Sequence, residues 1–346
     1  MTASAPAKQI VRQESEEPRH GVTQLRVSFV IPAHNEETML GALLESLEAL
    51  SRPEGVEIEE IIVADAESTD DTREIATRAG CRVVNASRGA ASVARNAGAA
   101  VAKGNVLAFV DADCLLPSDW LFQVAHAFSD DEVVAMSTPM AAPASDASWV
   151  SRGWFRLTSA STTAESAEWL PSFNFAVRTD SFRRSGRFDA DLVTCEDVEI
   201  CHRLKQAGQL RFGTGQSVEH CGASESLWEF MRREAWRSRG ALSLLKRYWK
   251  DPREVLSTLI PVLISLCLCA TAVLCVTWFA FGWPGGMAGR TAVILTAVSG
   301  PFLLLLLALR QRVALLHLPS AILLLTCYCL ARTSGCFLSV SRVQRR

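Results

Sequence analysis

The stretch GNVLAFVDADCLLP, residues 104–117, places two aspartates directly after an apolar run. The run from Val106 to Val110 is typical of a buried strand, and Asp111 and Asp113 follow it. Side chains at positions i and i+2 of an extended segment point to the same side, so these two carboxylates repel each other. An ordinary loop does not need such a pair, whereas a site that collects a divalent cation does. The stretch therefore predicts a cation site at the end of a strand.

Short β-rich runs and helical patterns alternate around this stretch. The strand-like runs begin at Leu25 and stop at Pro32, and continue with 58–63, 81–86 and 105–110. Helical spacing follows in ETMLGALLESLEAL (37–50), in DDTREIATRAG (70–80, closed by Gly80) and in ASVARNAGAAVAKG (91–104, ending at Gly104). Strands and helices of these lengths in alternation predict an α/β fold, with a mostly parallel sheet and helices on both faces.

Polar turns follow three of the predicted strands. They are Asn35–Glu36, Asp65 and Asp111–Asp113. In parallel sheets with helices on both faces, ligands bind beyond the carboxyl ends of the strands. We therefore expect these three turns to converge on one site.

The composition separates a soluble domain from a membrane region. From Val255 onward the chain is almost entirely apolar, whereas the formal net charge of −2 gives no electrostatic case for nucleic-acid binding. Residues 1–24 are polar and are expected to form a flexible tail. We divide the rest into an α/β domain (25–222), a basic amphipathic segment (223–253) and a membrane region (254–346).

Two long uncharged segments, at about 255–281 and 291–309, predict transmembrane helices. Each is close to the roughly 20 residues that cross a hydrocarbon core. The basic clusters KRYWKDPR (246–253) and RQR (310–312) lie outside this pair on both sides. The positive-inside tendency places these flanks, and the α/β domain with them, in the cytoplasm. The expected location is therefore the inner (plasma) membrane, with a multi-pass anchor and a cytoplasmic domain.

Two further segments near the membrane allow more than one interpretation. The apolar segment 313–331 has basic residues beyond both ends, which favours an interfacial or re-entrant helix over a third span. Segment 223–253 combines arginines with Trp and Tyr just before the first span, which is typical of helices lying on an anionic membrane surface. An ordinary solvated helix face is the alternative for that segment.

Several ordered motifs resemble those of the family 2 glycosyltransferases, which have the GT-A fold. The motifs are VSFVIPAHNEE (27–37), IIVADAESTDDT (61–72), RGAASVARNAGAAVAKGNVLAFVDADC (88–114) and NFAVRTDSFRRSGRFDADLVTCEDVEICHRL (174–204). The resemblance covers residues 27–220, and several motifs at compatible spacing are far more specific than one DxD. It implies a GT-A domain, a Rossmann-like α/β fold, which here precedes C-terminal transmembrane helices.

The resemblance implies a metal and diphosphate site. Asp111 and Asp113 would hold Mg²⁺ or Mn²⁺, which steadies the diphosphate of a nucleotide-sugar donor. His220, downstream in SVEHCGAS, is a candidate third contact to the metal or diphosphate, although a lone histidine is more often structural. Arg95 lies at a helix start that could favour phosphate, and a surface arginine is the alternative.

The resemblance also assigns the nucleotide pocket. Pro32, Asn35 and Glu36 match the turn after the first strand that lines this pocket, and Asp65 matches the carboxylate that reads the base. Glu67 stands in DAES where the family usually has glycine, as in DDGS or DGGS. This departure leaves the base open, so a UDP-sugar is only the donor expected by default.

The catalytic base of the family is the aspartate of an ED pair, here Glu196–Asp197. An inverting displacement needs a carboxylate to accept the proton of the acceptor hydroxyl. We expect Asp197 to be this base and Glu196 to orient the acceptor. At the start of a helix, the dipole is expected to lower the pKa of the base and keep it ionised. The alternative is that both acids only complement the dipole.

These observations predict a non-processive, membrane-anchored, inverting glycosyltransferase. Processive members carry QxxRW, whereas RREAW (232–236) departs from it at two positions. The membrane anchor favours a lipid-linked or membrane acceptor in the synthesis of a cell-surface glycan or glycolipid. One alternative is a sugar nucleotidyltransferase, although PAHNEE (32–37) lacks the Gly and Lys expected there. The other is a non-catalytic membrane scaffold that binds nucleotide-sugars.

Overall fold

A mixed, mostly parallel sheet forms the centre of the N-terminal domain. The computed structural model describes residues 24–159, 167–222, 224, 226–281, 286–311 and 314–343, so the predicted tail (1–24) lies almost wholly outside the described residues. The sheet order is β3-β2-β1-β4-β7-β6-β8. Its strands are β1 (Leu25–Ala33), β2 (Val56–Asp65), β3 (Arg82–Asn85), β4 (Val106–Val110), β6 (Val133–Ser137), β7 (Asn174–Arg178) and β8 (Gln209–Phe212). Only β7 runs antiparallel to its neighbours, so the predicted fold class is confirmed.

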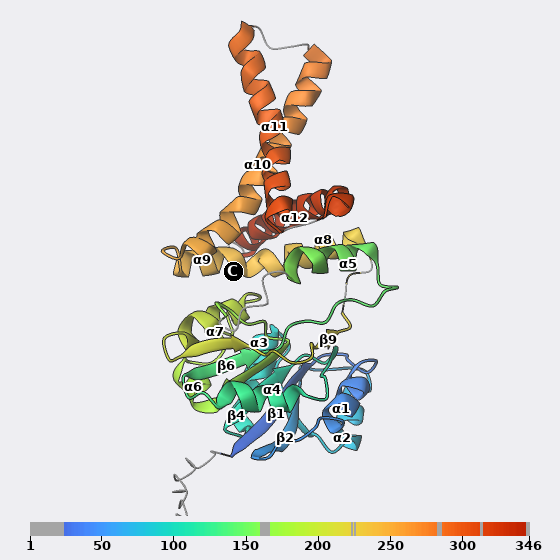
Figure 1. Ribbon diagram of the computed structural model, residues 1–346, viewed down its shortest axis with the longest axis vertical. Helices are drawn as coiled ribbons and strands as arrows, with labels where there is room; N and C mark the ends of the chain where they lie inside the picture. The colour runs from blue at the N-terminus through green and yellow to red at the C-terminus, as the bar shows by residue number, and fades with distance from the viewer. Residues whose placement is uncertain are drawn as a thin grey trace, which may run out of the picture.

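Helices cover both faces of this sheet (Figure 1). They are α1 (Leu40–Glu48), α2 (Thr72–Arg78), α3 (Ala91–Val101), α4 (Trp120–Phe128), α6 (Thr179–Arg184) and α7 (Glu196–Leu204). One buried apolar cluster contains residues of α1 and α4, and a second contains residues of α3, α6 and α7. The buried central strands explain why the sequence shows continuous apolar runs there rather than alternation.

Two predicted element ends differ from the structure. β1 continues through Pro32 to Ala33, because its pairing with β4 stops at Val30 and only β2 pairs with it at Pro32. A proline is tolerated where one side of a strand carries no ladder. Helix α3 ends at Val101, three residues before Gly104. The predicted end of the helix before it, α2, at Gly80 is confirmed: α2 ends at Arg78, and Gly80 has φ +73°.

A second layer of helices lies above the carboxyl ends of the parallel strands (Figure 1). It contains α5 (Trp149–Thr158), α8 (Leu227–Arg237), a 3₁₀ turn η2 (Ser238–Gly240) and α9 (Ala241–Arg247). We call these elements, with residues 248–251, the membrane-proximal layer. Helices α10 (Pro252–Phe281) and α11 (Gly286–Arg310) rise from it, and α12 (Leu318–Val343) crosses their foot beside α8 and α5. A shared apolar cluster joins α5, α8, α10, α11 and α12.

Among the described residues, two helices are long and apolar enough to cross a membrane: α10 over Pro252–Ala280 and α12 over Leu318–Phe337. The first agrees with the predicted span 255–281. The second predicted span, 291–309, lies within α11, whose described apolar part is Val298–Arg310; the side chains of 292–297 lie outside the described residues. The segment predicted as 313–331 is helical from Leu318 and continues to Val343. Its interfacial placement stays a prediction.

We predict that Gly104→Ala destabilises the domain. A Cβ at position 104 would lie 2.4 Å from the Arg26 carbonyl oxygen and 2.7 Å from the Ser28 nitrogen, and backbone atoms cannot give way easily. The expected loss is about 2 kcal/mol in the free energy of unfolding, measured by denaturant titration. Gly41→Ala in α1, where a Cβ meets nothing within 4 Å, is the control and should gain about 0.5 kcal/mol. Equal stability of both variants would contradict the packing argument.

Candidate active site

The two aspartates after β4 meet a histidine from a distant part of the chain. Two-residue strands, β5 (Cys114–Leu115) and β9 (Glu219–His220), pair antiparallel with Cys114 opposite His220. The Cys221 N–H also donates to the Asp113 carbonyl oxygen at 2.8 Å. As a result His220 Nε2 lies 3.7 Å from Asp113 Oδ1. A ladder too short to be recognised in the sequence thus brings the predicted third contact to the DxD.

Gly222 lets the chain pass close to this carboxylate. A Cβ at Gly222 would lie 2.4 Å from Asp113 Oδ2. Arg233 of α8 donates a hydrogen bond to the Gly222 carbonyl oxygen. The membrane-proximal layer therefore contacts a residue that lies beside the Asp113 carboxylate. The sequence signal for Gly222 was only its proximity to His220.

The donor atoms of Asp113, Cys114 and His220 lie within 4.8 Å of one another. Burial raises the pKa of the Cys114 thiol far above its usual range, so this sulfur stays protonated. A carboxylate and an imidazole suit Mg²⁺ or Mn²⁺, whereas a neutral thiol does not. The oxygens of Asp113 and the nitrogen of His220 therefore fit a hard divalent cation. Asp111, the other predicted ligand, lies outside this group and accepts at Oδ1 from Arg95, so its role as a ligand stays a prediction.

Glu36 also belongs to this acidic group. Burial and the charges of Asp113 and Asp111 raise the pKa of Glu36 to about 7. The first-strand turn was assigned to the nucleotide pocket, and the structure places Glu36 of that turn within electrostatic reach of the DxD. A concentration of negative charge at one point is what a bound cation relieves.

Arg95 joins the DxD to the ED pair. Its guanidinium donates from Nη2 to Asp111 Oδ1 at 2.6 Å and from Nη1 to Glu196 Oε1 at 2.8 Å. The side chain is 3% exposed, so the surface alternative is wrong, whereas a contact with phosphate stays a prediction. The structure uses Arg95 to hold two acidic segments 85 residues apart (196 − 111) at one point.

The Glu196–Asp197 pair begins α7, as predicted. Cys195 precedes it with φ +67°, and Ser172 Oγ donates to Glu196 Oε1 at 3.4 Å. The pKa of Asp197 is raised to about 7 by burial and by the charge of Glu196, with Arg95 opposing. The expectation that the helix start lowers this pKa was therefore wrong, because desolvation and a like charge outweigh the dipole.

The turns after β1 and β2 are tied together. Asn35, at φ +58°, accepts at Oδ1 from the Thr69 N–H at 2.8 Å, and its own N–H donates to Ser68 Oγ at 2.9 Å. The Asn35 side chain therefore shapes this edge of the sheet. Pro32 lies half-buried in β1, opposite Ala64 of β2.

Asp65 lies at the end of β2, almost fully buried. Its Oδ2 accepts from Arg73 Nη1 at 2.7 Å, and the same nitrogen donates to Asn85 Oδ1 at 2.8 Å. With Glu67 and residues 86–87 these side chains line a cavity of about 250 Å³. The sequence singled out Asp65 but missed Arg73 and Asn85, because nothing local marks a helix residue and a strand end as partners of one carboxylate.

The comparisons with known proteins point to one family. The description "Glycosyl transferase family 2" applies to the family model that matches residues 28–192. Glucosyl-3-phosphoglycerate synthase of Mycolicibacterium smegmatis is 35% identical over 99 residues, 26% of this chain and 32% of that protein. Pre-mycofactocin glycosyltransferase of Mycobacterium tuberculosis is 26% identical over 244 residues, 67% of this chain and 50% of that protein. The chain thus spans half or less of the length of these curated relatives.

Among solved structures, mannosyltransferase PcManGT from Pyrobaculum calidifontis, in complex with GDP-Man and Mn²⁺, superposes with a TM-score of 0.64. The match covers 92% of this chain and 87% of that chain at 16% sequence identity. At this identity the similarity is one of fold, and it extends well beyond the α/β domain.

We predict that Glu67→Gly stabilises the domain. Glu67 adopts φ +60°, the conformation that glycine enters without a Cβ penalty, which explains why glycine is usual at this position in the resembling motif. The expected gain is about 1 kcal/mol in the free energy of unfolding by denaturant titration. The neighbouring Ala66→Gly is the control and should lower stability, since it only adds freedom to the unfolded chain. A loss of stability in Glu67→Gly would contradict the argument.

Proposed function

Since residues 28–192 match the family model described as glycosyl transferase family 2, we propose that this chain is a glycosyltransferase that transfers one sugar from a nucleotide-sugar to a lipid-linked acceptor. The proposed enzyme is membrane-anchored, metal-dependent and inverting, and it works at the cytoplasmic face of the inner membrane. The observation that carries the proposal is the Arg95 bridge. One buried guanidinium binds both Asp111 and Glu196, so the candidate metal site and the candidate base belong to one centre.

Asp111, Asp113 and His220 are the proposed ligands of Mg²⁺ or Mn²⁺. When bound, the cation supplies positive charge that stabilises the departing diphosphate. The presence of Mn²⁺ in the complex of PcManGT supports a divalent cation as the cofactor. The role of the protein is to present the carboxylates from a rigid strand end, held by the Arg95 pair and the β5–β9 ladder.

Asp197 is the proposed general base. It accepts the proton of the acceptor hydroxyl while that oxygen bonds to the anomeric carbon and the bond from that carbon to the diphosphate oxygen breaks. Attack opposite the leaving group inverts the anomeric centre. A base with a pKa of about 7 is close to the value that general-base catalysis favours at neutral pH. Glu196, held by Arg95 and Ser172, is proposed to orient the acceptor.

The cavity at Asp65 is the proposed nucleobase site. Asp65, Arg73 and Asn85 provide acceptors and donors that can face a base edge. A UDP-sugar stays the default donor, and the GDP-Man in the PcManGT complex supports testing guanosine donors as well.

Exposed apolar surface on α10 supports the membrane anchor. Large side chains along the helix are more than two-fifths exposed, including Leu259, Leu266, Val276 and Phe279. Exposure of a continuous apolar helix surface to water is unfavourable, whereas lipid chains can cover it. Exposed Trp249 and Trp278 lie near its two ends, as expected of residues at membrane interfaces. The membrane-proximal layer lies beyond the carboxyl ends of the parallel strands (Figure 1) and contacts the segments of Gly222, Thr194 and Glu199, which supports a lipid-linked acceptor.

The direct experiment uses full-length protein in lipid. Nucleotide release is followed with a panel of UDP-, GDP- and dTDP-sugars, with and without a lipid extract that contains prenyl phosphates and lipid-linked saccharides. Donor-specific release that requires lipid acceptor supports the proposal. Release of pyrophosphate from a sugar 1-phosphate and a nucleoside triphosphate would favour the nucleotidyltransferase, and binding without turnover would favour the scaffold.

We predict that Asp197→Asn lowers kcat by at least about 100-fold, because the amide cannot accept the proton. In the unmodified enzyme, kcat/KM should fall about tenfold between pH 8 and pH 6, since protonation of a group with a pKa of about 7 removes the base. Initial rates with saturating metal measure both. A pH-independent wild-type profile, or an Asp197→Asn enzyme with full activity, would refute the base.

We also predict that transfer depends on a divalent metal ion. Excess chelator should abolish transfer and added Mn²⁺ should restore it. Asp113→Asn should lower kcat/KM by about 100-fold and weaken Mn²⁺ binding in calorimetric titrations. The control is Asp131→Asn, whose fully exposed carboxylate precedes β6 and which should behave like the unmodified enzyme. Undiminished transfer in chelator would remove the metal role.

A further inference from the structure

Helix α7, which carries the ED pair, is attached to the membrane-proximal layer through the loop just before it and along its length. At the start, Thr194 Oγ1 donates to the Arg237 carbonyl oxygen at 2.9 Å and accepts from the Gly240 N–H at 2.9 Å. A Cβ at Gly240 would lie 2.1 Å from the Thr194 carbonyl oxygen, so η2 and this loop are in backbone contact.

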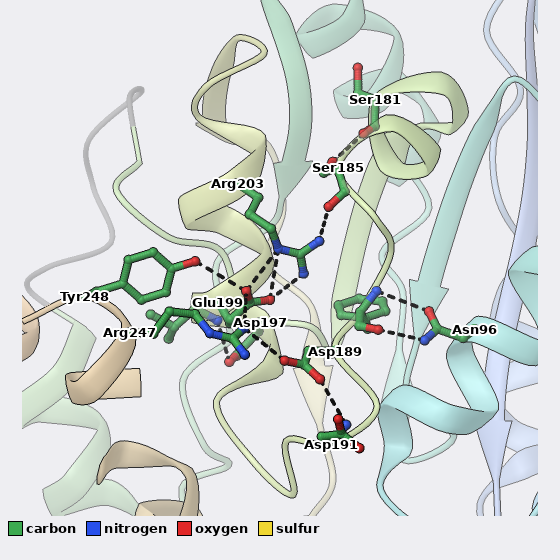
Figure 2. A network of polar contacts seen from close by, with 12 residues as sticks. Asn96, Ser181, Ser185, Asp189, Asp191, Asp197, Glu199, Arg203, Arg247 and Tyr248 are labelled. Atoms are coloured by element: carbon green, nitrogen blue, oxygen red, sulfur yellow. Dashed lines mark hydrogen bonds and ion pairs between the residues drawn. The ribbon is translucent and has the colours of Figure 1, made fainter. Parts of the chain in front are cut away.

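The second attachment is a buried carboxylate, Glu199 (Figure 2). Its side chain is 2% exposed and accepts hydrogen bonds from Arg203 Nε at 3.0 Å, Arg247 Nη1 at 2.7 Å and the Tyr248 hydroxyl at 3.3 Å. Arg247 also contacts Asp189 Oδ2 at 2.9 Å. Arg203 belongs to α7 itself, whereas Arg247 and Tyr248 belong to the end of α9 and the residue after it.

A third contact leads directly to the first membrane helix. The His202 ring stacks on Tyr248 with centroids 4.1 Å apart, and His202 Nε2 lies 3.1 Å from Glu254 Oε1 in the first turn of α10. Asp197, Glu199 and His202 therefore lie on one helix that is held by the residues where the chain enters the membrane region.

Glu199 has more partners than its charge requires. A buried carboxylate needs a cation, and Arg203 one turn away on the same helix already provides one. The positive charge of Arg247 is also matched by Asp189, and the bonds that Arg247 and Tyr248 make to Glu199 determine where α7 lies relative to α9. Bonds between segments about 48 residues apart restrict position, whereas a bond within one helix does not.

We propose that Glu199 is a positioning residue for the transfer reaction, which holds the helix of the Glu196–Asp197 pair against α9 through Arg247 and Tyr248. This inference rests on the proposed function, because it acts through the base. It assigns to the membrane-proximal layer a role in catalysis as well as in anchoring: the base reaches its working position only when α9 is docked on α7.

The test uses full-length protein in lipid, with Arg247→Met as the main variant. We expect kcat to fall about 10-fold to 100-fold while the KM for the donor stays within about twofold, because the base moves and the donor site does not. Glu199→Gln should lower kcat by a similar factor. The double variant should lose no more than the worse single variant, since both substitutions remove the same Glu199–Arg247 bond. Arg247→Lys should recover part of kcat.

Controls separate positioning from general destabilisation. The ion pair Arg211–Asp130, with an N–O distance of 2.8 Å, joins β8 to the loop before β6 and not α7 to α9, and Arg211→Met should leave kcat unchanged. Thermal unfolding and titration with UDP and GDP check that each variant is folded with an intact donor site. Tyr248→Phe removes only one hydroxyl; it should lower kcat by a smaller factor than Arg247→Met, and it serves if Arg247→Met does not fold.

Two outcomes overturn the inference while leaving the proposed function intact. One is unchanged kcat in Arg247→Met and Tyr248→Phe while Asp197→Asn is inactive. The other is that Arg211→Met lowers kcat as much as Arg247→Met does, or that the losses of Arg247→Met and Glu199→Gln add fully in the double variant. Full activity of Asp197→Asn would instead remove the proposed base itself.

Discussion

The buried guanidinium of Arg95 is the interaction on which the centre depends. A cation removed from water must be matched by negative charge, and here the matching groups are Asp111 and Glu196. The requirement to satisfy Arg95 therefore draws the end of β4 and the start of α7 to the same point. In a site with so many acids, one internal cation also limits the repulsion before any metal binds.

Backbone conformation at this edge of the sheet supports the same arrangement. Asn35, Glu67 and Cys195 all adopt left-handed φ values, between +58° and +67°. They follow β1, follow β2 and precede α7, so each lies in a loop that aims a candidate site residue. Such conformations persist where surrounding contacts determine them, and they gather at functional sites. Here the Asn35 side chain and the Thr194 contacts with α8 and η2 provide that support.

The membrane-proximal layer is part of the architecture of the site. Arg233 contacts the loop of Gly222 beside Asp113, Thr194 contacts η2 just before the ED pair, and Glu199 binds Arg247. Each contact joins α8, η2 or α9 to a segment that carries a candidate catalytic or metal-binding residue. An acceptor that approaches along the membrane would therefore meet groups already ordered by the elements that face it.

Local patterns of residues were enough to predict the elements that depend on neighbouring positions. Apolar periodicity and turn residues predicted the alternating strands and helices, β4 with its two aspartates, the glycine after α2 and the helix of the ED pair. Spacing, turns and buried apolar runs are properties of neighbouring residues, so a sequence shows them directly. Family resemblance supplied the candidate base and metal ligands. Four features came from the folded arrangement alone: the partners of Arg95, the approach of His220 through the β5–β9 ladder, the raised pKa of Asp197 and the attachment of Glu199 to α9. These depend on contacts between segments up to about a hundred residues apart and on burial, which no local pattern encodes.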